Sequence, residues 1–140
     1  MGNEEDCPRG PDTKKMTYDF ENEYFKIGAC EMQGWRKTME DAAIILSNFD
    51  KKNTSLFGIL DGHGGSVVSK FVAYNLKALL IRTDSYKKGN YEQALIESFL
   101  LMDDILADVE INKFLSKSQF QNHIKLVNAE PGEPNYVKFF

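Results

Sequence analysis

The stretch that most constrains the fold of this chain is residues 57–65, which read FGILDGHGG. An apolar run typical of a β-strand ends in the carboxylate of Asp61, and the glycines that follow surround His63. Beyond Gly65 the apolar residues recur at three- and four-residue steps, which predicts an amphipathic helix over residues 66–82 with Ser66 as its N-cap. A strand therefore passes into a helix through a glycine-rich turn that carries a carboxylate and an imidazole.

The rest of the chain predicts strands before this turn and helices after it. Short apolar runs indicate strands around residues 25–29, 42–46 and 56–60, and the polar segment 47–55 suits a hairpin connection between the last two. A second helix is predicted to begin after Asn90, whose side chain can cap it, with Gln93 three residues on. Its inward-facing residues are expected to be Leu95, Phe99, Met102, Ile105, Leu106 and Val109. Strands followed by helices favour an α+β fold.

Composition limits the classes of protein to consider. The 140 residues, 42% hydrophobic and 27% charged, suit one globular domain. The formal net charge of −4 disfavours nucleic acid as a partner, and no apolar run approaches the roughly 20 residues of a transmembrane helix. Two cysteines, Cys7 and Cys30, allow at most one disulfide and exclude a cysteine-rich zinc site. We therefore expect an intracellular protein, cytoplasmic or nuclear, without a transmembrane segment.

Both ends of the chain differ in composition from its middle. Residues 1–18 are expected to form a flexible tail, because they contain prolines and glycines and few apolar residues. Gly2 and Cys7 are candidate sites of weak lipid anchoring, which their acidic neighbours oppose. After residue 118 the apolar pattern loosens, and the sequence PGEP opposes regular structure. The expected organisation is a tail over 1–18, a folded part over 19–118 and a divergent or truncated segment over 119–140.

Residues at the glycine-rich turn have the chemistry of a metal or phosphate site. A carboxylate held at the end of a buried strand suits a metal ligand, and glycines allow a backbone carbonyl or N–H group to approach an ion closely. His63 can exchange a proton near neutral pH. The alternative is a plain Asp-Gly turn followed by a flexible Gly-Gly joint, which explains the glycines but not the histidine.

A second polar stretch lies immediately before the strand predicted at 42–46. If residues 36–42 are extended, alternation puts Arg36 and Glu40 on one face and Asp41 on the other. A phosphate-binding guanidinium and a metal-binding carboxylate would then share a face. The alternative is a solvated face with an ion pair between Arg36 and Glu40.

Taken together, the two stretches supply a set of oxygen donors. Glu40, Asp61 and the carbonyl of Gly62 form an all-oxygen set, which is the preference of Mg²⁺ or Mn²⁺. Hard dications activate water and clamp a phosphoryl group when carboxylates and a cationic side chain lie nearby. The sequence therefore indicates phosphate-ester hydrolysis.

Both stretches resemble a known family. MQGWRKTMEDA, residues 32–42, and FGILDGHGG are similar to the first two motifs of the metal-dependent protein phosphatases of type 2C, in the same order and at similar spacing. The similarity extends from about Tyr24 to Met102. It implies the N-terminal part of a four-layer α-β-β-α sandwich with antiparallel sheets and a dinuclear Mg²⁺ or Mn²⁺ site at one end. The implied function is that of a protein serine/threonine phosphatase, which hydrolyses phosphoserine and phosphothreonine in phosphoprotein substrates.

By motif position, the resemblance assigns metal binding to three residues. Asp61 would bridge two ions, Glu40 would ligate one of them, and Gly62 would contribute its carbonyl oxygen. The family has further aspartates for the second ion, whereas Asp108 is the last aspartate here, so the second metal site is expected to be incomplete. A non-catalytic pseudophosphatase or phosphoprotein-binding fragment is therefore the alternative to an active phosphatase.

The resemblance assigns substrate binding and proton transfer to three further residues. Arg36 would hold the substrate phosphate, His63 would protonate the leaving oxygen, and Asp41 would orient the attacking metal-bound water. A rival interpretation takes Cys30 and Arg36 as the nucleophile and phosphate ligand of a cysteine-based phosphatase. That chemistry needs a phosphate-binding loop followed by a helix, and a buried Cys30 on a strand is the simpler expectation.

Overall fold

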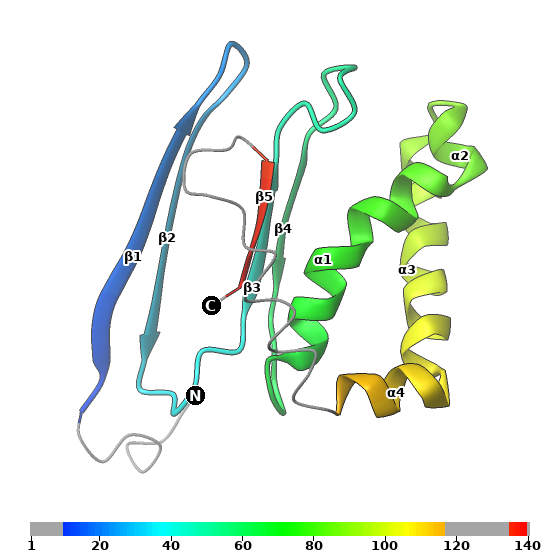
Figure 1. Cartoon of the computed structure of the whole chain (residues 1–140). Helices are drawn as coiled ribbons and strands as arrows, with labels where there is room; N and C mark the ends of the chain where they lie inside the picture. Colours follow the sequence, from blue (N-terminus) through cyan, green and yellow to red (C-terminus); the bar gives the residue numbers. More distant parts are fainter. Residues whose placement is uncertain (1–9, 117–134, 140) are drawn as a thin grey trace. The chain divides into compact units, whose positions relative to one another are not determined.

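The computed structural model describes residues 10–116 and 135–139, and it divides into two compact units (Figure 1). The first unit is Met1–Met39 and the second is Glu40–Phe140. The predictions made for Gly2, Cys7 and the PGEP sequence concern positions outside the described residues. The described part is α+β, as predicted, with two small antiparallel sheets and helices.

The first unit contains a β-hairpin made of β1 (Asp12–Glu21) and β2 (Lys26–Gly34), which pair antiparallel. The Asn22 side chain holds the turn between them, because its Oδ1 accepts hydrogen bonds from the N–H groups of Tyr24 and Phe25 at 2.8 and 2.7 Å. β2 confirms the strand predicted around residues 25–29.

The strand β1 begins at Asp12, inside the stretch 1–18 for which a flexible tail was expected. Residues 12–17 are all exposed. Backbone pairing with β2, and not burial of apolar side chains, therefore accounts for the strand, and the search for apolar runs missed it for that reason.

The second unit contains a three-stranded antiparallel sheet in the order β4-β3-β5. β3 (Ala42–Leu46) and β4 (Leu56–Leu60) form the predicted hairpin around the polar loop 47–55. β5 (Asn135–Phe139) pairs with the other edge of β3 and was not predicted. Its sequence NYVKF does not alternate between apolar and polar residues, so it carried no clear strand signal.

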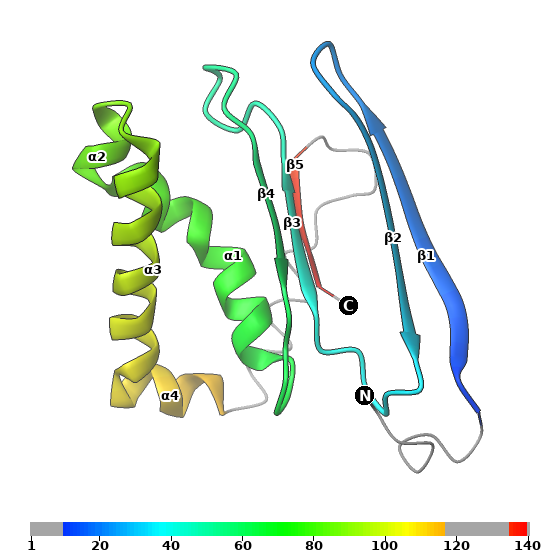
Figure 2. The same cartoon turned by 180° about the vertical axis from the view of Figure 1, so that it is seen from behind.

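The helix α1 (Val67–Arg82) confirms the prediction for residues 66–82 and packs against β3 and β4 (Figure 2). Ser66 stands at the N-cap position, as expected, but its side chain makes no capping hydrogen bond. The core joins β3, α1, α3 and α4, and its buried members are Ala42, Ile44, Leu46, Phe71, Val72, Ala73, Leu76, Leu79, Met102 and Leu115. This packing fixes the direction in which α1 leaves the glycine-rich turn.

Three helices follow, α2 (Asp84–Lys87), α3 (Tyr91–Ala107) and α4 (Val109–Leu115). Asn90 caps α3 as predicted, since its Oδ1 accepts a hydrogen bond from the Gln93 N–H at 3.3 Å. Within the described residues, none of the helices is long and apolar enough to cross a membrane.

The prediction of which α3 side chains point inward is only partly correct. Three of its residues contribute to the core or pack against it, namely Met102, Ile105 and Leu106. Three others are exposed, namely Leu95, Phe99 and Val109. The buried side of α3 includes Ala94 and Ser98, whose small side chains suit close packing beside α1. The spacing of apolar residues did not reveal that the buried side of α3 includes small residues.

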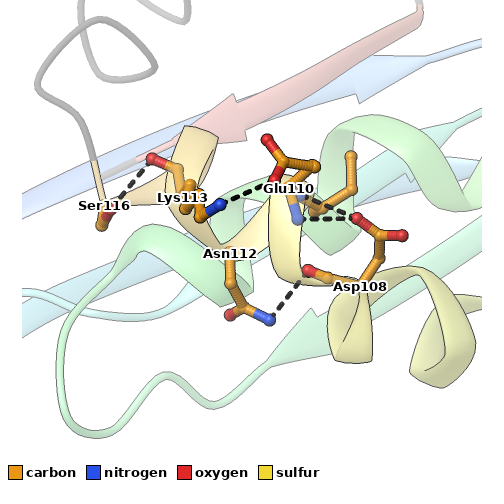
Figure 3. A network of polar contacts seen from close by, with 6 residues as sticks. Asp108, Glu110, Asn112, Lys113 and Ser116 are labelled. Carbon is orange, nitrogen blue, oxygen red and sulfur yellow. Dashed lines mark hydrogen bonds and ion pairs between the residues drawn. The ribbon is translucent and has the colours of Figure 1, made fainter.

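The helix α3 ends at Ala107, and Asp108 stands between it and α4 as a capping residue (Figure 3). The Asp108 backbone is extended, and its Oδ1 accepts hydrogen bonds from the N–H groups of Glu110 and Ile111 at 2.8 and 3.1 Å. Lys113 pairs with the Glu110 carboxylate one turn later at 2.7 Å. The chain therefore changes direction at an aspartate cap, where the periodicity had suggested one continuous helix.

The β3–β4 loop is tied to α2 through Asp50. Its carboxylate accepts hydrogen bonds from the hydroxyl groups of Tyr86 and Thr54, at 2.7 and 2.8 Å, and from the Lys52 N–H at 2.8 Å. Desolvation acts to raise the pKa of Asp50, but these hydrogen bonds outweigh it and lower the pKa from 3.8 to about 2. Desolvation and the bond to Asp50 raise the pKa of Tyr86 to about 12.

We expect Tyr86→Phe to lower the free energy of unfolding by about 1 kcal/mol at pH 7, because it removes a hydrogen bond to a carboxylate. Since the pKa of Asp50 is lower in the folded state, its contribution is present above pH 3.8 and is lost as the pH falls toward about 2. The difference between wild type and Tyr86→Phe should therefore shrink over this range in urea unfolding experiments.

The control is Tyr91→Phe, which removes the hydroxyl of a ring 5.4 Å from that of Tyr86 and should change stability by less than about 0.5 kcal/mol. An equal loss in both variants at every pH would contradict this account.

Candidate active site

The candidate site lies in the second unit, where β3 begins and β4 ends. These strands pair antiparallel with Ala42 opposite Leu60, so the residues before β3 lie beside the residues after β4. The former are the acids Glu40 and Asp41, and the latter are the glycine-rich turn. The register of one hairpin thus joins two segments that are separate in the sequence.

The two backbones approach so closely at Gly62 that only glycine fits there. A Cβ built on Gly62 would collide with the carbonyl oxygen of Glu40 and would lie 2.8 Å from the hydroxyl oxygen of Ser69. Gly65 is needed for another reason, since its φ of +114° lies in a region that L side chains rarely adopt. Both glycines have defined structural roles, so a merely flexible joint does not describe the turn.

Both acids before β3 hold the backbone of the turn. Asp41 Oδ1 accepts a hydrogen bond from the Gly62 N–H at 3.2 Å, and Glu40 Oε2 accepts one from the Gly65 N–H at 3.1 Å. The Ser69 hydroxyl donates to the carbonyl oxygen of Glu40 at 2.5 Å. Two carboxylates are thereby kept at one turn by neutral backbone donors.

This arrangement corrects the alternation considered for residues 36–42. Residues 36–41 are not in a strand, and β3 begins only at Ala42. The chain bends at Lys37 and Thr38, which breaks the regular alternation of side chains. Glu40 and Asp41 therefore do not lie on opposite faces of a strand, and both reach the same turn.

Asp61 and His63 are exposed on the turn. Both line a pocket of about 330 Å³ between the end of β4 and the start of α1. The other lining residues are Leu60, Gly62, Gly65, Val68, Ser69 and Val72. The pocket thus combines a carboxylate and an imidazole with an apolar wall.

Arg36 and Cys30 belong to the first unit. Arg36 is exposed, and its carbonyl oxygen accepts a hydrogen bond from the Gln33 side-chain amide at 2.8 Å. Cys30 lies in β2 and is exposed, so the expectation of a buried cysteine was wrong, because a two-stranded hairpin has little interior. Between Arg36 and β3 this described stretch contains no helix, so Cys30 lacks the surroundings that a cysteine-based phosphatase needs.

The donor set at the turn fits a hard divalent cation. Glu40 and Asp61 offer carboxylates, and Gly62 offers a carbonyl oxygen on a backbone that contacts that of Glu40. Mg²⁺ commonly takes one or two carboxylates, with water and substrate phosphate completing its coordination. The described residues contain no group of three or more His, Cys, Asp or Glu side chains that could hold a metal by themselves. Oxygen donors of this kind are those that magnesium and manganese prefer, whereas zinc favours sulfur and nitrogen donors.

Sequence reasoning missed one residue of this site, Ser69. It is only 5% exposed and lies on the buried side of α1. A polar residue on the apolar side of an amphipathic helix needs a hydrogen-bond partner, and this was the signal that could have found it.

Comparison with known proteins identifies the family. The model of the family described as Protein phosphatase 2C matches residues 25–120, which include both motifs. The chain belongs to the protein phosphatase 2C family, as the two motifs predicted.

Individual relatives agree with this assignment. The chain is 46% identical over 96 residues to probable protein phosphatase 2C 21 of Arabidopsis thaliana, a match that covers 69% of this chain and 27% of the relative. It is 44% identical over 127 residues to probable protein phosphatase CG10417 of Drosophila melanogaster, covering 91% of this chain and 17% of that protein. With probable protein phosphatase 2C 5 of Paramecium tetraurelia the identity is 40% over 107 residues, covering 74% and 36% of the two chains. The chain thus spans about a third or less of the length of these relatives.

We expect Gly62→Ala to lower the free energy of unfolding by about 2–3 kcal/mol. The added Cβ would collide with the carbonyl group of Glu40, which can move only if the backbone around it moves as well. Urea unfolding followed by circular dichroism measures the loss. Gly58→Ala is the matched control, since its Cβ would meet the Ile44 side chain at an ordinary 3.7 Å and should change stability by less than about 1 kcal/mol. Equal stability of the two variants would show that the turn has room at Gly62.

Proposed function

We propose that this chain carries the N-terminal part of the catalytic domain of a protein serine/threonine phosphatase, which hydrolyses phosphoserine and phosphothreonine in proteins. The observation that carries the proposal is that the Glu40 and Asp41 carboxylates accept hydrogen bonds from the turn that follows Asp61. This turn lies within the region that matches the phosphatase family. Relatives named as probable protein phosphatases support the class of reaction. The proposed substrates are intracellular phosphoproteins.

Glu40, Asp61 and the carbonyl of Gly62 are proposed as the groups that would hold Mg²⁺ or Mn²⁺. Such ions, when bound, lower the pKa of a water molecule and offset the negative charge of the phosphate. The chain itself contributes preorganisation, because the Gly65 N–H keeps the Glu40 carboxylate at the turn. The close contact between Gly62 and Glu40 keeps their backbones together.

Arg36, His63 and Asp41 are proposed to act on the substrate. The Arg36 guanidinium can form paired hydrogen bonds to phosphate oxygens. His63, exposed at the pocket, would give a proton to the serine or threonine oxygen as it leaves. Asp41 would orient the attacking water, and its hydrogen bond from the Gly62 N–H would hold its carboxylate for this role.

We also propose that the second unit forms part of a four-layer α-β-β-α sandwich. Along β4, Leu56 and Leu60 pack against the core, whereas Phe57 and Ile59 are 47% and 78% exposed. An apolar sheet face of this kind suits packing against a second sheet. The folded part predicted over 19–118 would then belong to such a domain, with β1 extending it toward the N-terminus.

A non-catalytic module that binds phosphoproteins is the second candidate. Within the described ranges no cluster of three or more metal-ligating side chains forms, and this observation favours such a module. Such a pseudophosphatase would bind one ion weakly and hold the phosphate through Arg36 without hydrolysing it.

The test is hydrolysis of a phosphothreonine peptide by the 140-residue chain with Mn²⁺. We expect turnover that EDTA abolishes and that Asp61→Asn lowers at least about a hundredfold, because the variant loses a negative charge that the dication needs. Asp104→Asn alters an exposed acid of α3 and should keep the wild-type rate. Cys30→Ser should also keep it.

Each result has a defined meaning. Loss of turnover in Cys30→Ser would contradict the metal-based reaction. A folded wild-type chain that binds one Mn²⁺ in calorimetry and hydrolyses nothing would favour the phosphoprotein-binding module.

A further inference from the structure

Ser69, near the start of α1, lines the pocket, and the proposed chemistry gives it no role. It is 5% exposed, and its hydroxyl donates to the carbonyl oxygen of Glu40 at 2.5 Å. This bond joins α1 to the segment that precedes β3. We propose that Ser69 is a positioning residue, which fixes the backbone of Glu40 and thereby sets the affinity of the site for a divalent cation. The inference rests on the metal-binding role proposed for Glu40.

Ser69 acts on the backbone of Glu40 and not on its carboxylate. The carbonyl oxygen of Glu40 lies against Gly62 and also accepts the Ser69 hydroxyl, so the three groups meet at one point. Because a peptide group is planar, fixing this carbonyl also fixes the N–H of Asp41 and the start of both acidic side chains. The carboxylates then reach the N–H groups of the turn at 3.1 and 3.2 Å. Loss of the hydroxyl would allow this plane to rotate and would loosen both hydrogen bonds.

The hydroxyl of Ser69 has a second acceptor within its own helix, the carbonyl oxygen of Ser66 at 3.1 Å. A hydroxyl donates a single hydrogen, so the two bonds are alternatives, and the bond to Glu40 is the shorter. When the segment before β3 moves away, the hydroxyl can turn to Ser66 and is not left unpaired. Ser69 therefore biases the position of Glu40 by a moderate amount and does not lock it.

Ser98 provides a matched control on another helix. It is 0% exposed in α3, and its hydroxyl donates to the carbonyl oxygen of Ala94 at 2.6 Å. Ser98→Ala removes a buried helical hydroxyl of the same kind from a bond within α3 alone.

The experiment compares wild type, Ser69→Ala and Ser98→Ala in the full 140-residue chain. Amide hydrogen exchange at Gly62 and Gly65, measured by NMR without metal, reports the two bonds from the turn to the acids. Calorimetric titration with Mn²⁺ reports the affinity of the site. We expect Ser69→Ala to speed exchange at both glycines about fivefold to tenfold and to raise the Kd for Mn²⁺ by a similar factor. Ser98→Ala should leave both quantities within about twofold of wild type.

Wild-type exchange at both glycines in Ser69→Ala would overturn the inference, as would equal changes in the two serine variants. A wild-type chain that binds no Mn²⁺ would overturn the proposed metal site. If amide exchange were still faster in Ser69→Ala, the role of Ser69 in fixing the Glu40 backbone would be confirmed on its own. If Ser69→Ala does not fold by circular dichroism, Ser69→Cys replaces it, because a thiol of similar size is a weaker donor and should give changes of the same sign.

Discussion

The contact between the Glu40 carbonyl and Gly62 is the constraint on which the candidate site depends. It exists because β3 and β4 pair with Ala42 opposite Leu60, which forces the residues before one strand against the residues after the other. Only a residue without a side chain can occupy that crossing. Once the backbones touch, two consecutive acids lie within reach of the N–H groups of the turn, and α1 must begin immediately beyond it. The chemistry of the site thus follows from strand register.

The β3–β4 hairpin is tied to helices at both of its ends. At the loop end, the hydroxyl of Tyr86 in α2 donates to Asp50, and at the site end, the hydroxyl of Ser69 in α1 donates to Glu40. Between these two bonds, apolar packing of α1 on the strands supplies most of the contact. The two hydroxyl groups therefore fix the position of the hairpin relative to α1 and α2, which packing of apolar side chains alone specifies less sharply.

Local sequence signals predicted the elements that bury apolar residues, namely β3, β4, α1 and α3, and the family to which the two motifs belong. They failed where another force decides the structure. β1 is held by backbone pairing although its first residues are exposed, and the buried side of α3 relies on the small residues Ala94 and Ser98. At the site, the spacing of the motifs pointed to Glu40 and Asp61. It did not show that both acids before β3 accept hydrogen bonds from one turn, or that the Ser69 hydroxyl donates to the Glu40 carbonyl. Those contacts depend on strand register and on helix packing, which the local sequence does not reveal.

The exposed apolar residues of β4 have a consequence for the behaviour of the isolated chain. In the described part of the protein, β4 is an edge strand of its sheet, and Ile59 and Phe57 stand on its open face. Edge strands of this kind recruit strands from other molecules, and they do so more readily as the concentration rises. Within the described residues, the five that deliver Asp61 to the pocket thus combine a sheet edge with exposed apolar side chains, a combination that favours association between strands of different molecules.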